Sequence, residues 1–197
     1  GKIPVDMDKM NIDLLSFSAH KFHGLKGCGA LVMNQYLKLV PEITGGHQMY
    51  GLRSGTINVA GAVALAKALR LAIEPLQTNY QHVKQLFDHT MNELRKIDGV
   101  VVNSNHEHQT PYIINFAAAP IKGETLVHAL EEYDVYISAK SACSSKSATA
   151  SRILLALGIS DEVAQESVRV SFSNLSTMEE VDRLIKALKI VVAQLKH

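Results

Sequence analysis

Lys21 is the residue whose sequence surroundings best suit covalent chemistry. It ends the run Ser18-Ala-His20-Lys21, which follows the apolar residues 14–17, and a glycine-rich return begins at Gly24. A lysine amine must lose its proton before it can act as a nucleophile, and removal from water lowers the pKa of the amine toward that state. A lysine that follows a hydroxyl and an imidazole at the end of a buried strand therefore suits the attachment of a carbonyl cofactor. The alternative is a strand that ends in a solvated turn.

Two further side chains have the chemistry of a functional site. Cys143 lies in the small, polar stretch 141–150, although free cysteine is normally among the most buried residues. Lys140 and Lys146 lie near Cys143 in the sequence and favour the thiolate, which is the nucleophilic form of cysteine. Arg169 projects away from the apolar face of its predicted strand, and its planar guanidinium can bind a carboxylate through two parallel hydrogen bonds. The alternative for this arginine is a surface ion pair with a glutamate of the last helix.

The composition is that of a globular chain and excludes several classes of function. The chain has 197 residues, 47% of them apolar and 20% charged, and its net charge is +1. This balance of charges indicates neither a nucleic-acid-binding surface nor a polybasic membrane patch. No apolar run approaches the ~18 residues of a membrane span, and only two cysteines are present, which predicts a reducing, cytoplasmic setting. The nine histidines have no metal-ligand spacing, so no metal site is expected.

The first half of the sequence predicts two buried strands and two helices. Short apolar runs bounded by glycine predict buried strands at residues 14–17 and 30–33, on either side of the lysine turn. Residues 58–74 are apolar nearly all round, which predicts a buried helix ended by Pro75. Apolar residues at helical spacing predict a second helix over residues 80–97, with a cap at the following glycine.

The second half alternates between strand and helix patterns. An alternating apolar pattern over residues 168–172 places Arg169 on the polar face of a strand. A capping box formed by Ser176 and Glu179 predicts the start of a long final helix. The other predicted strands cover residues 100–103, 112–116 and 135–138, and the other predicted helices cover residues 124–133 and 151–157.

Four sequence motifs together point to one family. They are residues 13–24 with the lysine turn, residues 45–56 (Gly-Gly-His-Gln-Met-Tyr-Gly-Leu-Arg-Ser-Gly-Thr), residues 141–145 (Ser-Ala-Cys-Ser-Ser) and residues 167–172 (Ser-Val-Arg-Val-Ser-Phe). In this order they resemble the pyridoxal-phosphate-dependent cysteine desulfurases of the NifS/IscS type, in aminotransferase class V. The resemblance covers essentially the whole chain but only the C-terminal half of a family protein.

The resemblance implies a cofactor site around the lysine turn. It implies that Lys21 holds pyridoxal 5'-phosphate as a Schiff base and that Ser18 and His20 hydrogen-bond the cofactor phosphate. Lys26 is the competing lysine, but the family motif places the Schiff base at Lys21. The resemblance also implies that Thr56 reaches the cofactor phosphate of the neighbouring subunit in a homodimer. The alternative for Thr56 is the N-cap of the helix that follows it.

The resemblance assigns the remaining side chains to substrate chemistry. It implies that Cys143 attacks the sulfur of cofactor-bound L-cysteine and leaves as a persulfide. A sulfur-acceptor protein, either an iron–sulfur scaffold or a thiolation enzyme, would then take the sulfur. It also implies that Arg169 binds the α-carboxylate of the substrate. Cys28, between two glycines, is interpreted as structural.

The loop around residue 48 departs from the family pattern. The family usually has Gly-Gly-Gly-Gln-Glu-Arg where this chain has His47, Met49 and Tyr50 at the third, fifth and sixth positions. These three changes, which include a lost glutamate–arginine pair, put the loop geometry and substrate handling in doubt. Leu25 also replaces a proline, which affects the conformational freedom of the unfolded chain and not the chemistry.

The predicted fold is α/β, the C-terminal part of a pyridoxal-phosphate-dependent fold-type-I transferase. Residues 1–57 are predicted to end the large cofactor-binding domain, residues 58–98 to form linking helices, and residues 99–197 to form a small α/β domain. The predicted function is a portion of a cysteine desulfurase that is inactive as an isolated chain. Two alternatives remain, namely a catalytically incompetent dimerisation or docking module, and another fold-type-I enzyme such as a selenocysteine lyase or an aminotransferase.

Overall fold

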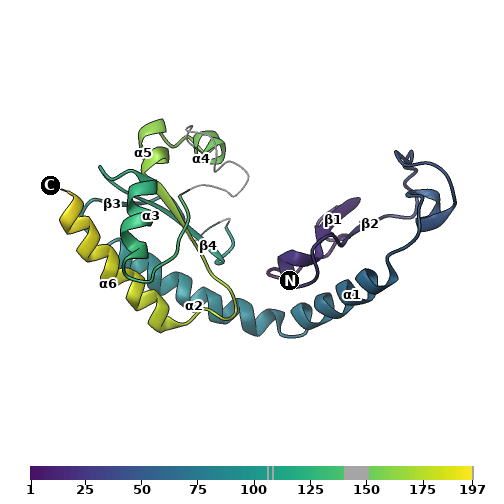
Figure 1. Cartoon of the computed structure of the whole chain (residues 1–197), viewed down its shortest axis with the longest axis horizontal. Helices are drawn as coiled ribbons and strands as arrows, with labels where there is room; N and C mark the ends of the chain where they lie inside the picture. Colours follow the sequence, from purple (N-terminus) through teal and green to yellow (C-terminus); the bar gives the residue numbers. More distant parts are fainter. Residues whose placement is uncertain (106, 108, 140–150, 197) are drawn as a thin grey trace. The chain divides into compact units, whose positions relative to one another are not determined.

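The computed structural model describes residues 1–105, 107, 109–139 and 151–196, and Cys143 therefore lies outside the described residues. The chain divides into two compact units, Gly1–Gln77 and Thr78–His197 (Figure 1). Each unit combines helices with antiparallel strands, so the fold is mixed α/β, as the sequence predicts.

The first unit is built around a two-stranded hairpin and one helix. Strands β1 and β2 pair antiparallel from Leu14 opposite Met33 to Ser18 opposite Gly29, with a short 3-10 helix directly after β1. Asn58 caps the helix α1, because its Oδ1 accepts a hydrogen bond of 2.9 Å from the Gly61 N–H. The elements of this unit are β1 (Leu14–Ser18), η1 (Ala19–Phe22), β2 (Gly29–Met33), η2 (Gln48–Gly51) and α1 (Val59–Ile73).

The prediction that these strands and this helix are buried is wrong for this chain. The elements form where the sequence places them, but Leu31 of β2 is 51% exposed and Val63 of α1 is 65% exposed. Within α1 the only buried residue is Gly61. A two-stranded hairpin and one helix offer too few covering surfaces to bury apolar residues on every side.

The second unit contains a three-stranded antiparallel sheet with the order β3-β4-β5. Strand β5 is an edge strand, and beyond it Ser138 forms an isolated antiparallel bridge with Arg169. The elements of the unit are α2 (Leu76–Leu94, which begins just before the boundary), β3 (Val100–Val102), β4 (Ile113–Ala118), α3 (Gly123–Glu131), α4 (Arg152–Ala156), α5 (Asp161–Glu166), β5 (Ser167–Ser171) and α6 (Met178–Leu195).

One continuous core fills the second unit. It joins one face of the sheet to the apolar sides of α2, α3 and α6. Helices α2 and α6 run in the same direction, because contacts follow in the same order along both segments. His82 contacts the Ser176 carbonyl at 2.8 Å, His89 contacts Asp182 at 3.0 Å, and Asp98 contacts Lys196 at 2.7 Å beyond the helix ends. The largest fully buried side chains of this unit are Phe116, Leu86, Met91, Leu94, Ile114, Leu126, Leu130, Leu188, Val83, Val168, Val191 and Thr90.

Most elements predicted for the second unit are confirmed, and two predictions are wrong. Residues 135–138 do not form a strand, since only Ser138 makes a bridge. The capping box of the last helix lies one residue further on, at Thr177 and Glu180 and not at Ser176 and Glu179. Ser176 instead accepts a hydrogen bond of 3.1 Å from the Ser173 N–H through its hydroxyl oxygen.

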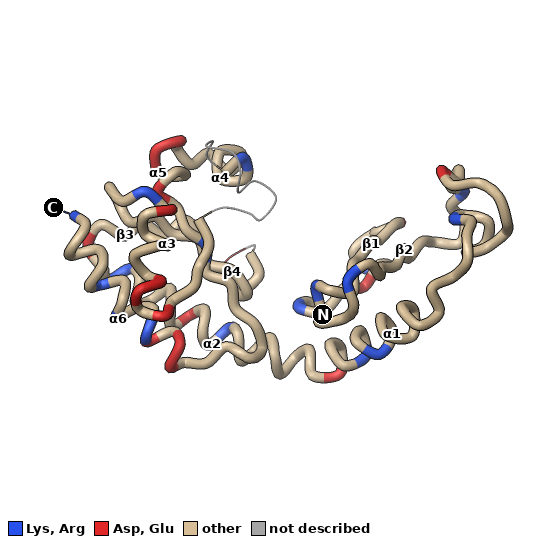
Figure 2. Tube along the Cα trace, viewed as in Figure 1, with Lys and Arg blue, Asp and Glu red and all other residues tan. Residues whose placement is uncertain are grey.

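The charges of the molecule form no single-sign stripe along the described chain. Figure 2 shows Lys and Arg interspersed with Asp and Glu along the helices of the second unit. In the part of the chain that the structure describes, no helix has the length and apolar character needed to cross a bilayer. The described residues also contain no group of three or more His, Cys, Asp or Glu side chains arranged to hold a metal ion.

Candidate active site

The hairpin of the first unit presents Lys21 and His20 to solvent. Both lie on η1 and are exposed, whereas Ala19 is fully buried and Phe22 is 9% exposed. The buried pair anchors the turn, so the two polar side chains between them point outward. The sequence-based expectation of a desolvated lysine is therefore wrong for this chain, because the side chain of Lys21 is open to water.

Main-chain hydrogen bonds close this turn. The Ala19 N–H donates to the Cys28 carbonyl at 2.9 Å, and the Gly24 N–H donates to the Ala19 carbonyl at 2.8 Å. A Cβ at Gly24 would lie 2.8 Å from the Ala19 Cβ, so only glycine fits this close approach. Ser18 is half-buried and its hydroxyl makes no capping bond to η1. The turn thus brings Ser18, His20 and Lys21 together on a fixed backbone.

Lys2 is a further cation near this turn, and sequence reasoning missed it. Partial burial lowers the pKa of the Lys2 ammonium, and the positive charge of Lys21 lowers this pKa further. Two positive charges near each other favour a bound anion. No spacing in the sequence could have indicated this pairing, because Lys2 lies far from Lys21 in the sequence and belongs to no helix or strand.

Thr56 lies on a separate loop of the first unit and is exposed. The alternative role considered for it, the N-cap of α1, is wrong because Asn58 makes that bond. The loop that leads to Thr56 is held by Ser54, which is 7% exposed and donates from its hydroxyl to the Gly46 carbonyl at 2.8 Å. Thr56 therefore has no capping role and is presented outward by an internally bonded loop.

The same loop contains two strained residues at positions where the chain departs from the family pattern. Met49 and Tyr50 have φ values of 49° and 58°, in the left-handed region that non-glycine residues rarely adopt. The Tyr50 side chain is 99% exposed and that of Met49 is 46% exposed. The large side chains of Met49 and Tyr50 therefore both lie exposed on a strained turn.

Cys28 packs against the start of α1. The Asn58 Nδ2 lies 3.9 Å from the Cys28 sulfur, and a Cβ on Gly61 would lie 2.5 Å from the same sulfur. The thiol thus occupies the space that the missing side chain of Gly61 leaves open. This close contact supports the structural interpretation of Cys28.

Arg169 lies at the centre of β5 in the second unit and is half-buried. Its N–H donates to the Ser138 carbonyl at 2.6 Å, and its carbonyl accepts from the Ser138 N–H at 3.1 Å. Its Nε atom is buried and has no hydrogen-bond partner within the described residues. Among these residues Arg169 also makes no ion pair with the final helix, so the alternative of a surface salt bridge with a glutamate there receives no support.

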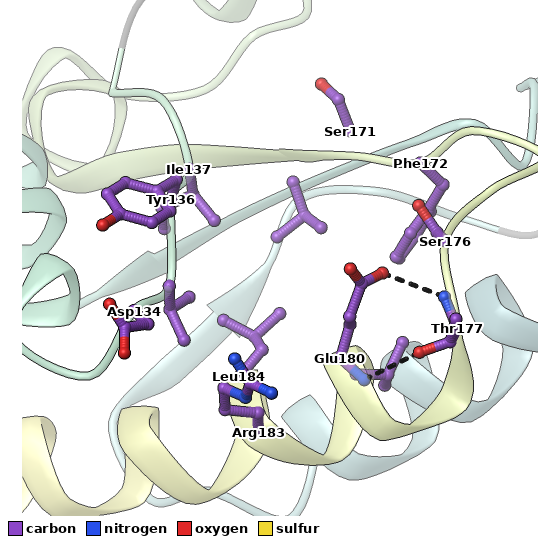
Figure 3. A pocket seen from close by; sticks show the side chains of 13 residues that line it. Asp134, Tyr136, Ile137, Ser171, Phe172, Ser176, Thr177, Glu180, Arg183 and Leu184 are labelled. Atoms are coloured by element: carbon purple, nitrogen blue, oxygen red, sulfur yellow. Dashed lines mark hydrogen bonds between the residues drawn. The ribbon is translucent and has the colours of Figure 1, made fainter.

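A cleft of about 270 Å³ opens at one end of the same sheet, between the segment 134–137 and the first turns of α6. Figure 3 shows Asp134 and Tyr136 on one side, and the capping bonds between Thr177 and Glu180 on the other. Arg169 is not among the residues that line the cleft. The cleft is therefore separate from the predicted substrate-binding arginine.

Comparisons with known proteins decide the family. The aminotransferase class-V family profile matches residues 1–184. The chain belongs to the aminotransferase class-V family. Among its members, the chain is 37% identical to the cysteine desulfurase IscS of Vibrio campbellii over 198 residues, which cover 100% of this chain and 48% of that protein. It is also 35% identical to the cysteine desulfurase IscS of an Escherichia coli strain, again over 100% of this chain and 48% of that protein.

Solved structures of class-V relatives have the same fold. A NifS-like protein superposes with a TM-score of 0.86 at 34% identity, over 98% of this chain and 50% of that one. A NifS-like protein from Rickettsia africae superposes with a TM-score of 0.84 at 24% identity, which shows the fold alone. The family resemblance inferred from the four motifs is confirmed. The chain spans about half the length of the relatives that it matches.

Proposed function

We propose that this chain is the C-terminal portion of a cysteine desulfurase of fold type I. In this proposal residues 1–57 complete the cofactor-binding domain, residues 58–98 link the domains and residues 99–197 form the small domain. The polypeptide equivalent to the other half of the relatives supplies the rest of the active site, and the isolated chain is inactive. The observation that carries the proposal is the turn that presents Ser18, His20 and Lys21 beside a second lysine.

The residues of this turn fit pyridoxal 5'-phosphate. Lys21 provides an amine that is accessible to an aldehyde, and Ser18, His20 and Lys2 provide donors and positive charge for a phosphate. Thr56, which is exposed on its own loop, is assigned to the phosphate in the second subunit of a homodimer. When bound, the cofactor supplies an electron sink for bonds at the substrate α-carbon.

The substrate side of the proposal rests on Arg169 and Cys143. Arg169 has a buried Nε–H without a partner among the described residues, which supports a role in binding the α-carboxylate of L-cysteine. Cys143 attacks the substrate sulfur as a thiolate, so that a new S–S bond forms while the C–S bond breaks, leaving L-alanine and a persulfide. An iron–sulfur scaffold or a thiolation enzyme then accepts the sulfur.

Reductive labelling tests the assignment of Lys21. The protein that contains this chain is mixed with pyridoxal phosphate and reduced with borohydride, and the labelled peptide is mapped by mass spectrometry. We expect the label on Lys21, with loss of labelling in Lys21→Arg and retention in the matched control Lys26→Arg. A label on Lys26, or no label, would contradict the proposal.

A separate variant tests the assignment of Cys143. Cys143→Ser should abolish persulfide formation and leave reductive labelling of Lys21 unchanged, because the two steps use different groups. Cys28→Ala should leave both unchanged. Equal loss of labelling and persulfide in Cys143→Ser would show that this cysteine is structural.

The strained loop favours a second candidate function. Met49 and Tyr50 differ from the family pattern, and their exposed side chains suit a dimerisation or docking module without catalysis. Alanine formation from L-cysteine distinguishes the two candidates, since a docking module would form none. Relative rates with selenocysteine and cysteine then separate a selenocysteine lyase from a desulfurase.

A further inference from the structure

A cluster of three polar side chains lies on the same sheet as Arg169. We call Asn103, Asn115 and Ser167 the amide cluster. Asn115 of β4 is directly opposite Arg169 of β5 in the strand register, so the two side chains share a face of the sheet. Ser167 precedes Arg169 by two residues on β5 and lies on that face as well.

Asn115 is the centre of this cluster. Its Oδ1 accepts a hydrogen bond of 2.7 Å from Asn103 Nδ2, and its own Nδ2 donates to the Val168 carbonyl at 3.0 Å. Asn103 Nδ2 also donates to the Ser167 hydroxyl at 2.9 Å. The side chains of the cluster therefore connect the segment after β3 with β4 and β5.

The Asn115 contact acts on the peptide that carries Arg169. Val168 is the residue before Arg169, so the Asn115 amide holds the carbonyl of the Val168–Arg169 peptide from the β4 side. Ser138 holds the N–H and the carbonyl of Arg169 from the opposite side. With both sides of the backbone bonded, the direction of the Arg169 side chain from the strand is fixed.

The restraint on the backbone matters because of one donor of the Arg169 guanidinium, its Nε–H. The Arg169 Nε is buried and has no partner in the described part of the chain, whereas buried donors are normally hydrogen-bonded. A side-on carboxylate takes one hydrogen bond from Nε and a second, parallel bond from a terminal nitrogen of the same fork. An unpartnered Nε–H is the donor that this mode of binding requires.

We infer that Asn115 is a positioning residue that holds Arg169 with its Nε–H directed at a carboxylate in the side-on mode. The inference rests on the proposed function, because it assumes that Arg169 binds the α-carboxylate of an amino acid. It adds to that function a residue outside the four motifs and a specific donor pair. Asn115 itself does not touch the substrate.

The first test follows the Arg169 Nε–H directly in the whole protein that contains this chain, before ligand is added. The 15N–1H resonance of Nε is assigned by its absence in Arg169→Lys. We expect a slowly exchanging signal in the unmodified chain and exchange at least tenfold faster in Asn115→Ala, since a lost hydrogen bond of ~1–1.5 kcal/mol corresponds to about tenfold. Asn92→Ala, an exposed asparagine on α2, is the matched control and should leave the signal unchanged.

The second test titrates the same samples with L-alanine and with L-alaninamide, which lacks the carboxylate. L-Alanine should shift the Nε signal of the unmodified chain, L-alaninamide should not, and Asn115→Ala should raise the dissociation constant for L-alanine about tenfold. If Asn115→Ala changes neither exchange nor affinity while Arg169→Lys weakens binding, the positioning inference is overturned and the proposed function stands. If L-alanine fails to shift the Nε signal at all, the carboxylate role of Arg169 is overturned, and the inference with it.

Asn103→Ala separates positioning from a general loss of structure. This variant removes one partner of the Asn115 side chain and leaves the bond from Asn115 to the Val168 carbonyl in place. We expect an effect on Nε exchange smaller than that of Asn115→Ala, with the same midpoint of urea unfolding in both variants. Equal effects of the two variants would show that the cluster supports the sheet and does not position Arg169.

Discussion

The two units of this chain have similar apolar sequences and very different interiors. In the second unit α2 buries Val83 and Met91 completely, whereas in the first unit the more apolar α1 leaves Val63 65% and Leu71 53% exposed. The buried apolar side chains of the first unit are Ala19 and Phe22. The difference teaches that an apolar helix is buried only when a sheet face and other helices cover it.

The contrast extends to the predicted site residues of each unit. Lys21 is held by the hydrogen bonds of a turn in the unit with little core, and Arg169 is held in a strand whose other face is fully packed. Local stability follows buried apolar contacts, so the two residues are supported to different degrees in this chain. The predictions below test this difference between the units.

The largest expected effect comes from one substitution made in both units. Leu126→Ala, at a fully buried position of α3, should lower the free energy of unfolding of the second unit by about 2–5 kcal/mol. Leu71→Ala, at an exposed position of α1, should change stability by less than about 0.5 kcal/mol. Urea titrations monitored by circular dichroism measure both. Equal losses of unfolding free energy in the two variants would contradict the difference in packing between the units.

A tight contact in the first unit provides the next effect. In Gly61→Ala the new Cβ would lie 2.5 Å from the Cys28 sulfur and 2.6 Å from the Asn58 Nδ2, and such overpacking costs about 1–3 kcal/mol. Faster hydrogen exchange of the α1 amides would report this loss. The double variant Gly61→Ala/Cys28→Ala should recover part of it. If the α1 amides of Gly61→Ala exchange as slowly as those of the unmodified chain, the contact between Gly61 and Cys28 is loose. The first unit would then be less tightly packed than the structure indicates.

A smaller effect is expected at the start of α6. The Thr177 hydroxyl accepts from the Glu180 N–H at 3.3 Å, and the Glu180 carboxylate accepts from the Thr177 N–H at 2.9 Å. Thr177→Ala should therefore lower the stability of the second unit by about 1 kcal/mol, measured by urea unfolding. Thr177→Ser, which keeps the capping hydroxyl, is the matched control and should lose much less stability. Equal losses in the two variants would contradict the capping role of the Thr177 hydroxyl.

The smallest effect concerns acid stability. A hydrogen bond from Lys196 lowers the pKa of the Asp98 carboxyl, and the charge of Lys196 lowers it further. Because the folded pKa lies below the unfolded value, the stabilisation is present above about pH 4 and is lost as the pH falls through the folded pKa. In Asp98→Asn the free energy of unfolding should fall slightly less steeply between about pH 4 and pH 2. The carboxylate is exposed, so a large change in slope would contradict this assignment.

The sequence predicted the elements of the second unit well because periodicity records which side of an element faces a core. The apolar spacing over α2 marked Val83, Met91 and Leu94, which are all buried. Residues 135–138 have the composition of a strand, but a strand needs a paired neighbour, and only Ser138 finds one. The capping box moved by one residue because Ser176 bonds its own turn.

The candidate site was only partly accessible from the sequence. The motif placed Ser18, His20 and Lys21 on one turn, which the structure confirms. The exposure of Lys21 depends on which surfaces cover the hairpin, and a local pattern does not contain that information. The proximity of Lys2 to Lys21 is a tertiary contact, and the contacts of Asn115 depend on strand pairing between distant residues, so no local spacing could reveal either.

The parallel pairing of α2 and α6 has a consequence for synthesis on the ribosome. His89 and Asp182, which join these helices, are 93 residues apart in the chain. At ~5–20 residues per second, about 5–20 s pass between the synthesis of the two partners. During most of that time the apolar side of α2 has neither β5 nor α6 to cover it. Nascent chains of this protein are therefore expected to need a chaperone until α6 has left the ribosome.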